Sequence, residues 1–128
     1  MPDTEKITIN MAAVDLGKID LLVQEGLYSN RTDFIRTAIR NLLDKHAVEI
    51  QQSVNRHSSV VGVLVYDRAD FEKRKALGEK ITISIVGVLY LASDITPELA
   101  RAVVESLHVR GVFNASEDVK AALTDRMK

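Results

Sequence analysis

The chain has 128 residues, of which 46% are hydrophobic and 27% charged, and a formal net charge of −1. This composition is typical of a globular protein with room for one domain or two small ones. Without cysteine, the sequence excludes a disulfide framework, a thiolate metal site and a cysteine nucleophile. No apolar stretch approaches the ~20 residues of a membrane span, and the N-terminal MPDTEK is polar. We therefore expect a cytoplasmic protein without a signal peptide or membrane contact.

The first predicted element is a short strand with the sequence KITINM, at residues 6–11. In a strand, successive side chains point to opposite faces. The alternation therefore gives one apolar face and one polar face, formed respectively by Ile7, Ile9 and Met11 and by Lys6, Thr8 and Asn10.

Two amphipathic helices follow the strand. Apolar residues recur at helical spacing over about 13–25, and Gly26 stands where a left-handed C-terminal cap is expected. A second helix begins after the candidate N-caps Ser29 and Asn30 and extends to about residue 46. Asp33, three residues after Asn30, suggests a variant of the capping box.

A strand and two helices within about 45 residues are too few to bury these apolar faces alone. We therefore expect a homodimer in which two copies of the strand pair antiparallel, with the helices closing over the apolar face. The opposite face would then display the polar strand residues of both chains on a ribbon about as wide as the DNA major groove.

The strand and the segment GLYSNRTDFIRTAIRNLL resemble the ribbon-helix-helix family of bacterial DNA-binding proteins, in its branch of copy-number and metal-responsive regulators. The resemblance covers about residues 5–46. It implies that the outward strand residues contact bases, and that the start of the second helix holds a DNA phosphate. The base contacts would be made by Lys6, Thr8 and Asn10, and the phosphate contact by Ser29, Asn30 and Arg31.

The chemistry of these residues agrees with those roles. Lysine can donate to guanine, asparagine can bond adenine in bidentate fashion, and threonine offers a hydroxyl and a methyl group. The free amides at a helix start attract anions. The alternatives are an ordinary polar edge strand and helix caps that hold no phosphate. For Arg31, Arg36 and Arg40, a solvated helix face competes with DNA contact.

The second half of the chain predicts a β/α repeat. A polar stretch between His46 and Ser59 suggests a linker or a frayed helix end. Beyond it, VVGVLVY, IVGVLYL and VRGVFNA each precede a turn-and-helix pattern, and their glycines, Gly62, Gly87 and Gly111, are 25 and 24 residues apart. This period predicts parallel strands with right-handed crossovers, stacked as a three-unit solenoid similar to leucine-rich-type repeats. The glycines would mark close backbone approach at equivalent points.

A ferredoxin-like (ACT-like) domain is the alternative architecture, because relatives that sense nickel carry one after the same DNA-binding half. Its strands would be 60–66, 80–91 and 108–114, and its helices 68–78 and 97–107. The three histidines, His46, His57 and His108, are scattered and do not predict a nickel site. No metal or cofactor is expected, and no enzyme motif is present.

Together these patterns predict an α+β protein with a DNA-binding and dimerisation domain at 1–47, a linker at 48–58 and an oligomerisation or regulatory domain at 59–128. The expected function is a transcriptional regulator, in the first place a repressor, that binds a palindromic operator as a dimer or, through the second domain, as a tetramer or larger species. The alternatives are an antitoxin that regulates its own synthesis, and a structural assembly protein.

Overall fold

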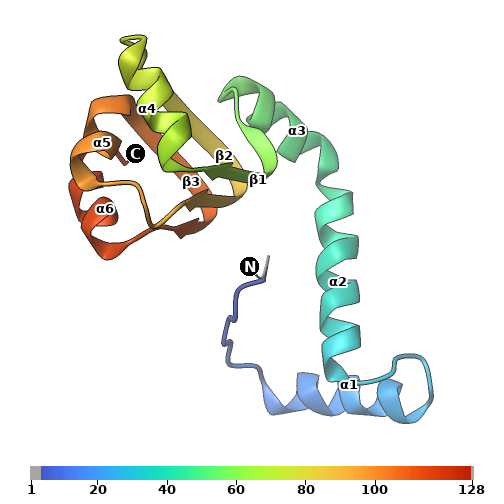
Figure 1. The fold of residues 1–128 in the computed structure, drawn as a ribbon. Helices are drawn as coiled ribbons and strands as arrows, with labels where there is room; N and C mark the ends of the chain where they lie inside the picture. The colour runs from blue at the N-terminus through green and yellow to red at the C-terminus, as the bar shows by residue number, and fades with distance from the viewer. Residues whose placement is uncertain (1–3, 128) are drawn as a thin grey trace. The chain divides into compact units, whose positions relative to one another are not determined.

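The computed structural model describes residues 4–127, which form two compact units divided between Gln52 and Ser53. The first unit contains helices α1 (Ala13–Gln24) and α2 (Arg31–Lys45) and most of α3 (Ala47–Arg56). The second contains a three-stranded sheet interleaved with short helices (Figure 1). In chain order its elements are β1 (Val60–Tyr66), α4 (Arg68–Ala76), β2 (Ile81–Leu91), α5 (Pro97–Val103), β3 (Val104–Asn114), α6 (Glu117–Ala122) and the 3-10 helix η1 (Thr124–Arg126).

The first two helices lie where the sequence predicts them. α1 ends in a left-handed glycine, since Gly26 has a φ of +83° and the amide of Leu27 donates to the carbonyl of Leu22 over 3.1 Å. α2 begins after Asn30, whose side chain accepts a hydrogen bond from the amide of Asp33. The predicted caps at both helix ends are therefore confirmed.

The polar stretch that we predicted as a linker or a frayed helix end, residues 48–58, is helical over most of its length. α3 follows α2 after the single residue His46 and continues to Arg56. Its apolar residues include Val48 and Ile50, which are exposed. The loss of the apolar stripe suggested a linker, but the stretch contains no proline or glycine that would stop a helix.

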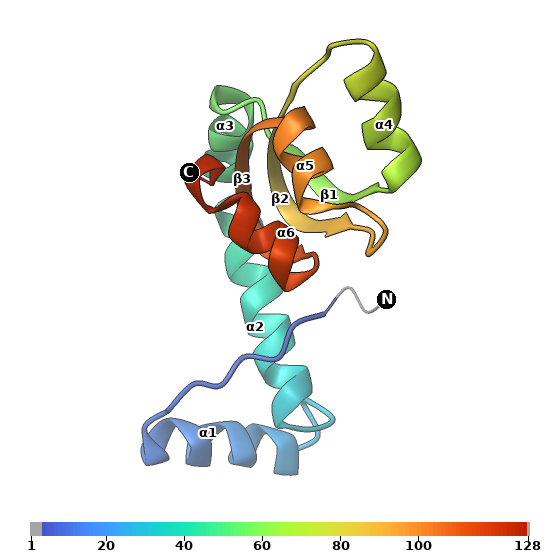
Figure 2. The same ribbon diagram turned by 60° about the vertical axis from the view of Figure 1, so that its left-hand side comes forward.

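The sheet is parallel throughout, in the order β1-β2-β3. Right-handed crossovers between strands in sequential order place α4 and α5 on one face of the sheet, and α6, which follows β3, lies on the same face, as Figures 1 and 2 show. A split βαβ arrangement would place another strand between those that one crossover connects. The direct pairing of β1 with β2 therefore excludes the ferredoxin-like alternative.

The predicted alignment of the three glycines is confirmed. Gly62 pairs with Gly87, and Gly87 pairs with Gly111. All three have φ between +132° and +142°, a region that L side chains rarely adopt. A Cβ atom on Gly87 would lie 2.0 Å from the carbonyl oxygen of Gly62, and one on Gly111 would lie equally close to that of Gly87. The glycines thus permit close backbone approach at one level of the sheet.

The core of the second unit lies between the sheet and its helices. Phe71 of α4, Val103 of α5 and Val119 of α6 pack with Leu89 of β2 and Leu107 of β3, each at most 1% exposed. Each helix begins after a side chain that accepts a hydrogen bond from an amide of its first turn: the Asp67 carboxylate before α4, the Thr96 hydroxyl before α5 and the Ser116 hydroxyl before α6.

β3 begins earlier than the sequence indicates. We expected a helix over 97–107, but α5 ends at Val103 and β3 starts at Val104 without a loop. The buried residues Val104 and Leu107 are paired with β2 in the sheet. Tertiary pairing therefore overrides the helical pattern of this segment.

Candidate nucleic-acid interface

The segment before α1 leaves both of its faces exposed. Residues 4–11 form no strand in the single chain, because a β-strand requires hydrogen bonds to a neighbouring strand and no described segment pairs with these residues. Ile7 is 72% exposed and Ile9 is 63% exposed. The polar residues Lys6, Thr8 and Asn10 are exposed as well. The predicted apolar face thus has no cover within the described part of this chain.

Next to this segment, an apolar groove opens between α1 and α2. It has a volume of about 310 Å³, and Met11, Ile19, Leu22 and Phe34 contribute its apolar lining. Ile19 is 4% exposed, whereas Leu21, Ile39 and Leu42 are 54%, 47% and 57% exposed. The first unit therefore has a small core of its own and a much larger apolar surface that remains in water.

The start of α2 is held by a reciprocal pair of hydrogen bonds. The amide of Asp33 donates to Asn30 Oδ1 over 2.8 Å, and the amide of Ser29 donates to Asp33 Oδ2 over 2.9 Å. Helix geometry leaves the amides of Arg31 and Thr32 in the first turn without intrahelical acceptors. An anion could approach these two amides, although the nearby Asp33 carboxylate opposes it electrostatically.

Arg31 binds Asp20 of α1 through its guanidinium group. Its Nε lies 2.7 Å from Asp20 Oδ1, and its Nη2 lies 2.8 Å from Oδ2. These hydrogen bonds lower the pKa of Asp20 from its ordinary value and raise that of Arg31. Sequence reasoning missed this pair, because two opposite charges 11 positions apart on different helices give no periodic signal.

The predicted site residues are therefore arranged in two groups in the first unit. Lys6, Thr8 and Asn10 lie on the segment before α1, whereas Ser29, Asn30 and Arg31 lie at the start of α2. Ser29 and Asn30 stabilise the helix start, and Arg31 joins α2 to α1.

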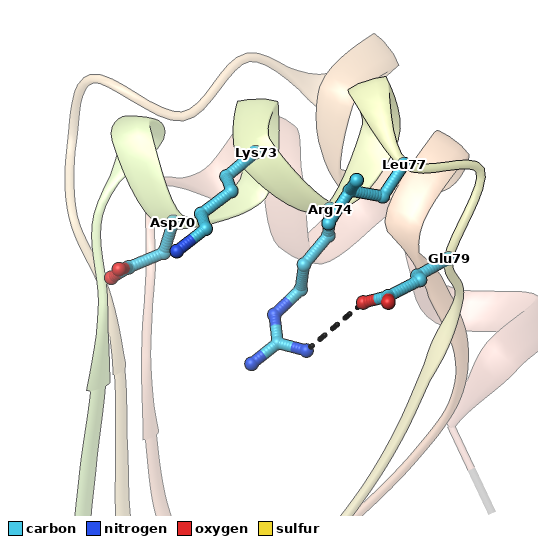
Figure 3. A pocket seen from close by; sticks show the side chains of 5 residues that line it. All are labelled: Asp70, Lys73, Arg74, Leu77 and Glu79. Carbon is cyan, nitrogen blue, oxygen red and sulfur yellow. Dashed lines mark ion pairs between the residues drawn. The ribbon is translucent and has the colours of Figure 1, made fainter.

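The second unit carries shallow charged hollows. The one drawn in Figure 3 is lined by two cations, two carboxylates and Leu77. Arg74 Nη1 lies 4.0 Å from Glu79 Oε2, and Lys73 extends toward Asp70. Because its charges balance, this hollow has no net attraction for an ion of either sign. Within residues 4–127, no three side chains of the metal-ligating kind come together.

Comparison with known protein families identifies the family to which the chain belongs. The model of the ribbon-helix-helix transcriptional regulator family matches residues 2–120. The chain therefore belongs to this family, whose members bind DNA to regulate transcription, usually as dimers. No curated protein and no solved structure matches the chain. Among the described helices, none has the length and apolar character needed to cross a membrane.

Proposed function

We propose that the protein is a homodimeric transcriptional repressor that contacts an operator through an antiparallel β-ribbon formed by residues 6–11 of two chains. The observation that carries this proposal is the exposure of Ile7 and Ile9, 72% and 63%, beside an apolar groove in a member of this family. A second copy that paired with the segment would cover these side chains.

In this dimer, the polar side chains of the ribbon enter the major groove. Lys6 donates to guanine, Asn10 forms a bidentate pair with adenine, and Thr8 contacts thymine through its methyl group. The two-fold axis of the dimer requires an operator with two inverted half-sites. Each base contact contributes about 1–3 kcal/mol of discrimination.

The start of α2 positions the ribbon on the DNA backbone. The free amides of Arg31 and Thr32, together with the side chains of Ser29 and Asn30, face a phosphate. Arg31 either keeps Asp20 while its amide binds, or exchanges Asp20 for the phosphate. Residues 1–47 contain six Lys and Arg against seven Asp and Glu, so affinity depends on these few contacts rather than on bulk charge.

In-vitro selection of bound DNA sequences from a random pool tests the proposal. We expect an inverted repeat to be enriched. Replacing Lys6, Thr8 and Asn10 together with alanine should then abolish selective binding without changing the dimer or its unfolding temperature. The matched control replaces Lys75, Asn114 and Thr124, which are exposed side chains of the same types in the second unit. Selective binding of full affinity by the Lys6, Thr8 and Asn10 variant would contradict the proposal.

An antitoxin has less support. Antitoxin tails that fold on their toxin are commonly disordered before binding, whereas the second unit has a buried core that extends from Phe71 of α4 to Leu123. We propose instead that this unit, as a short β/α solenoid, joins dimers into tetramers or larger species. Two dimers on adjacent sites would multiply the discrimination of one short operator.

A further inference from the structure

The two edges of the sheet differ in what protects them. At the β3 edge, Leu107 forms a parallel bridge with Met127, and Arg126 Nη1 donates to the carbonyl of Val104. The same strand carries Glu105, His108 and Arg110, and charged side chains discourage edge pairing. At the β1 edge, no described segment pairs with the strand. β1 has the sequence VVGVLVY, without a charge or a proline.

The free edge of β1 presents the backbone groups of its valines. The Gly62 carbonyl points toward Gly87 of β2, and the Tyr66 carbonyl accepts a hydrogen bond from the amide of Ala92, which follows β2. Successive peptide groups along a strand point to opposite sides. The backbone groups of Val63 and Val65 therefore point away from β2, to the unpaired edge.

The side chains of the same residues lie on the face of the sheet opposite α4, α5 and α6. Leu64 and Tyr66 pack against the core, so their neighbours in the strand project to the other side. Val61, Val63 and Val65 are 63%, 46% and 59% exposed. An uncharged strand of β-branched residues, exposed both at its edge and on one face, is suited to pair with another strand.

A second copy of β1 fits this edge. An antiparallel arrangement with a two-fold axis at Val63 places Val63 opposite Val63, Val61 opposite Val65, and Gly62 opposite Leu64. Val61, Val63 and Val65 then each meet a valine on the same face, and the two Val63 residues exchange both of their backbone hydrogen bonds. Because β1 has no charged residue, no electrostatic attraction favours a charged strand over a second copy of β1.

We propose that β1 pairs antiparallel with β1 of a second copy of this chain, in the register centred on Val63, and so joins two sheets into a continuous six-stranded sheet. The inference deepens the oligomerisation role proposed above and is independent of DNA contact. It makes the second unit a self-association module whose specificity comes from strand register.

The absence of cysteine from the sequence allows a direct test on the full chain, without DNA. In the proposed register, Val63→Cys residues of two copies have Cα atoms about 5.5 Å apart, within the range that a disulfide spans. Val65→Cys residues lie four positions out of register, about 13 Å along the strand, and cannot join. The double variant Val61→Cys/Val65→Cys restores facing pairs.

We expect mild oxidation to convert Val63→Cys and the double variant into covalent dimers roughly tenfold or more faster than Val65→Cys. Adding Val63→Lys to the double variant should abolish the cross-link, because two lysines would then face each other. Val112→Lys, on β3, is the matched control and should leave the cross-link intact. Circular dichroism shows whether each variant is folded.

Equal cross-linking of Val63→Cys and Val65→Cys, or none in Val63→Cys and the double variant, would overturn the proposal. Operator binding by reduced Val63→Cys is measured separately. A failure of strand pairing is therefore distinguishable from a failure of the DNA-binding proposal.

Discussion

At the scale of single residues, the pair formed by Asp20 and Arg31 changes the interpretation of a predicted DNA contact. The sequence shows Arg31 in the first turn of a helix, where a cation beside a phosphate is plausible. In the structure its guanidinium group donates hydrogen bonds from Nε and Nη2 to the two carboxylate oxygens of Asp20. A side chain that is already paired must exchange one anion for another, so its net gain from a phosphate is smaller than that of a free cation.

The same pair predicts a pH dependence of stability. Hydrogen bonds from Arg31 hold the pKa of Asp20 in the folded state below its ordinary value. The stabilisation is therefore present above the unfolded-state pKa of about 3.9 and is lost as the pH falls through the lower folded-state pKa. We expect Asp20→Asn to lower the unfolding temperature slightly at pH 7 and to have no effect at the acid end of this range.

Thermal unfolding between pH 2 and 7 measures the difference between wild type and Asp20→Asn. Asp44→Asn, which removes an exposed carboxylate from α2, is the control. If the difference between Asp20→Asn and wild type stays constant down to the lowest pH, the ion pair is not its source.

At the scale of elements, the aligned glycines make each strand depend on its neighbour. A methyl group on Gly87 or Gly111 meets the backbone of the preceding strand, whereas one on Gly62 meets nothing within 4 Å. Gly62→Ala therefore introduces strain from φ alone, whereas Gly87→Ala adds a steric overlap with backbone that cannot rotate away.

Urea denaturation separates these contributions. We expect Gly62→Ala to lower the free energy of unfolding of the second unit by about 1–3 kcal/mol, and Gly87→Ala to lower it by more. Gly17→Ala is the control, because Gly17 lies within helix α1 with open space around it and should gain about 0.5–1 kcal/mol. Equal effects at Gly62 and Gly87 would contradict the close approach.

The elements also show what the sequence could predict. α1, α2 and β1 follow from periodicity and caps, and the spacing of the glycines predicts the register of the sheet, because both signals are local or repeated. The start of β3 at Val104 could not be predicted, because helical spacing continues through this segment and pairing with β2 decides the outcome. Pairing with a second chain, as proposed for residues 6–11, likewise depends on contacts that one chain does not contain.

At the scale of the whole molecule, two different surfaces of one chain are available to further copies. The first unit exposes the apolar groove and Ile7 and Ile9, and the second exposes the edge of β1. If the first surface forms the dimer, the second is free to connect one dimer to another. Two dimers that pair both of their β1 edges with each other then form a closed tetramer, in which every β1 edge is paired.

Native mass spectrometry of the full chain at micromolar concentration tests this assembly. We expect tetramers for wild type and Val112→Lys, and dimers for Val63→Lys, because a lysine on the β1 edge disrupts strand pairing. On DNA with two adjacent operators, Val63→Lys should lose cooperativity while keeping its affinity for a single operator. A wild-type protein that stays dimeric would contradict the tetramer.

The bridge between Leu107 and Met127 has a consequence for the size that such an assembly can reach. A sheet with two unprotected edges elongates without limit, because each molecule that joins it presents a new unpaired strand, as in cross-β fibres. When two β1 strands pair, the outer edges of the six-stranded sheet are the two β3 strands, which are charged and partly covered. Growth of the sheet therefore terminates after a single joining event, so a strand composition that would otherwise favour fibres yields a sheet of only six strands.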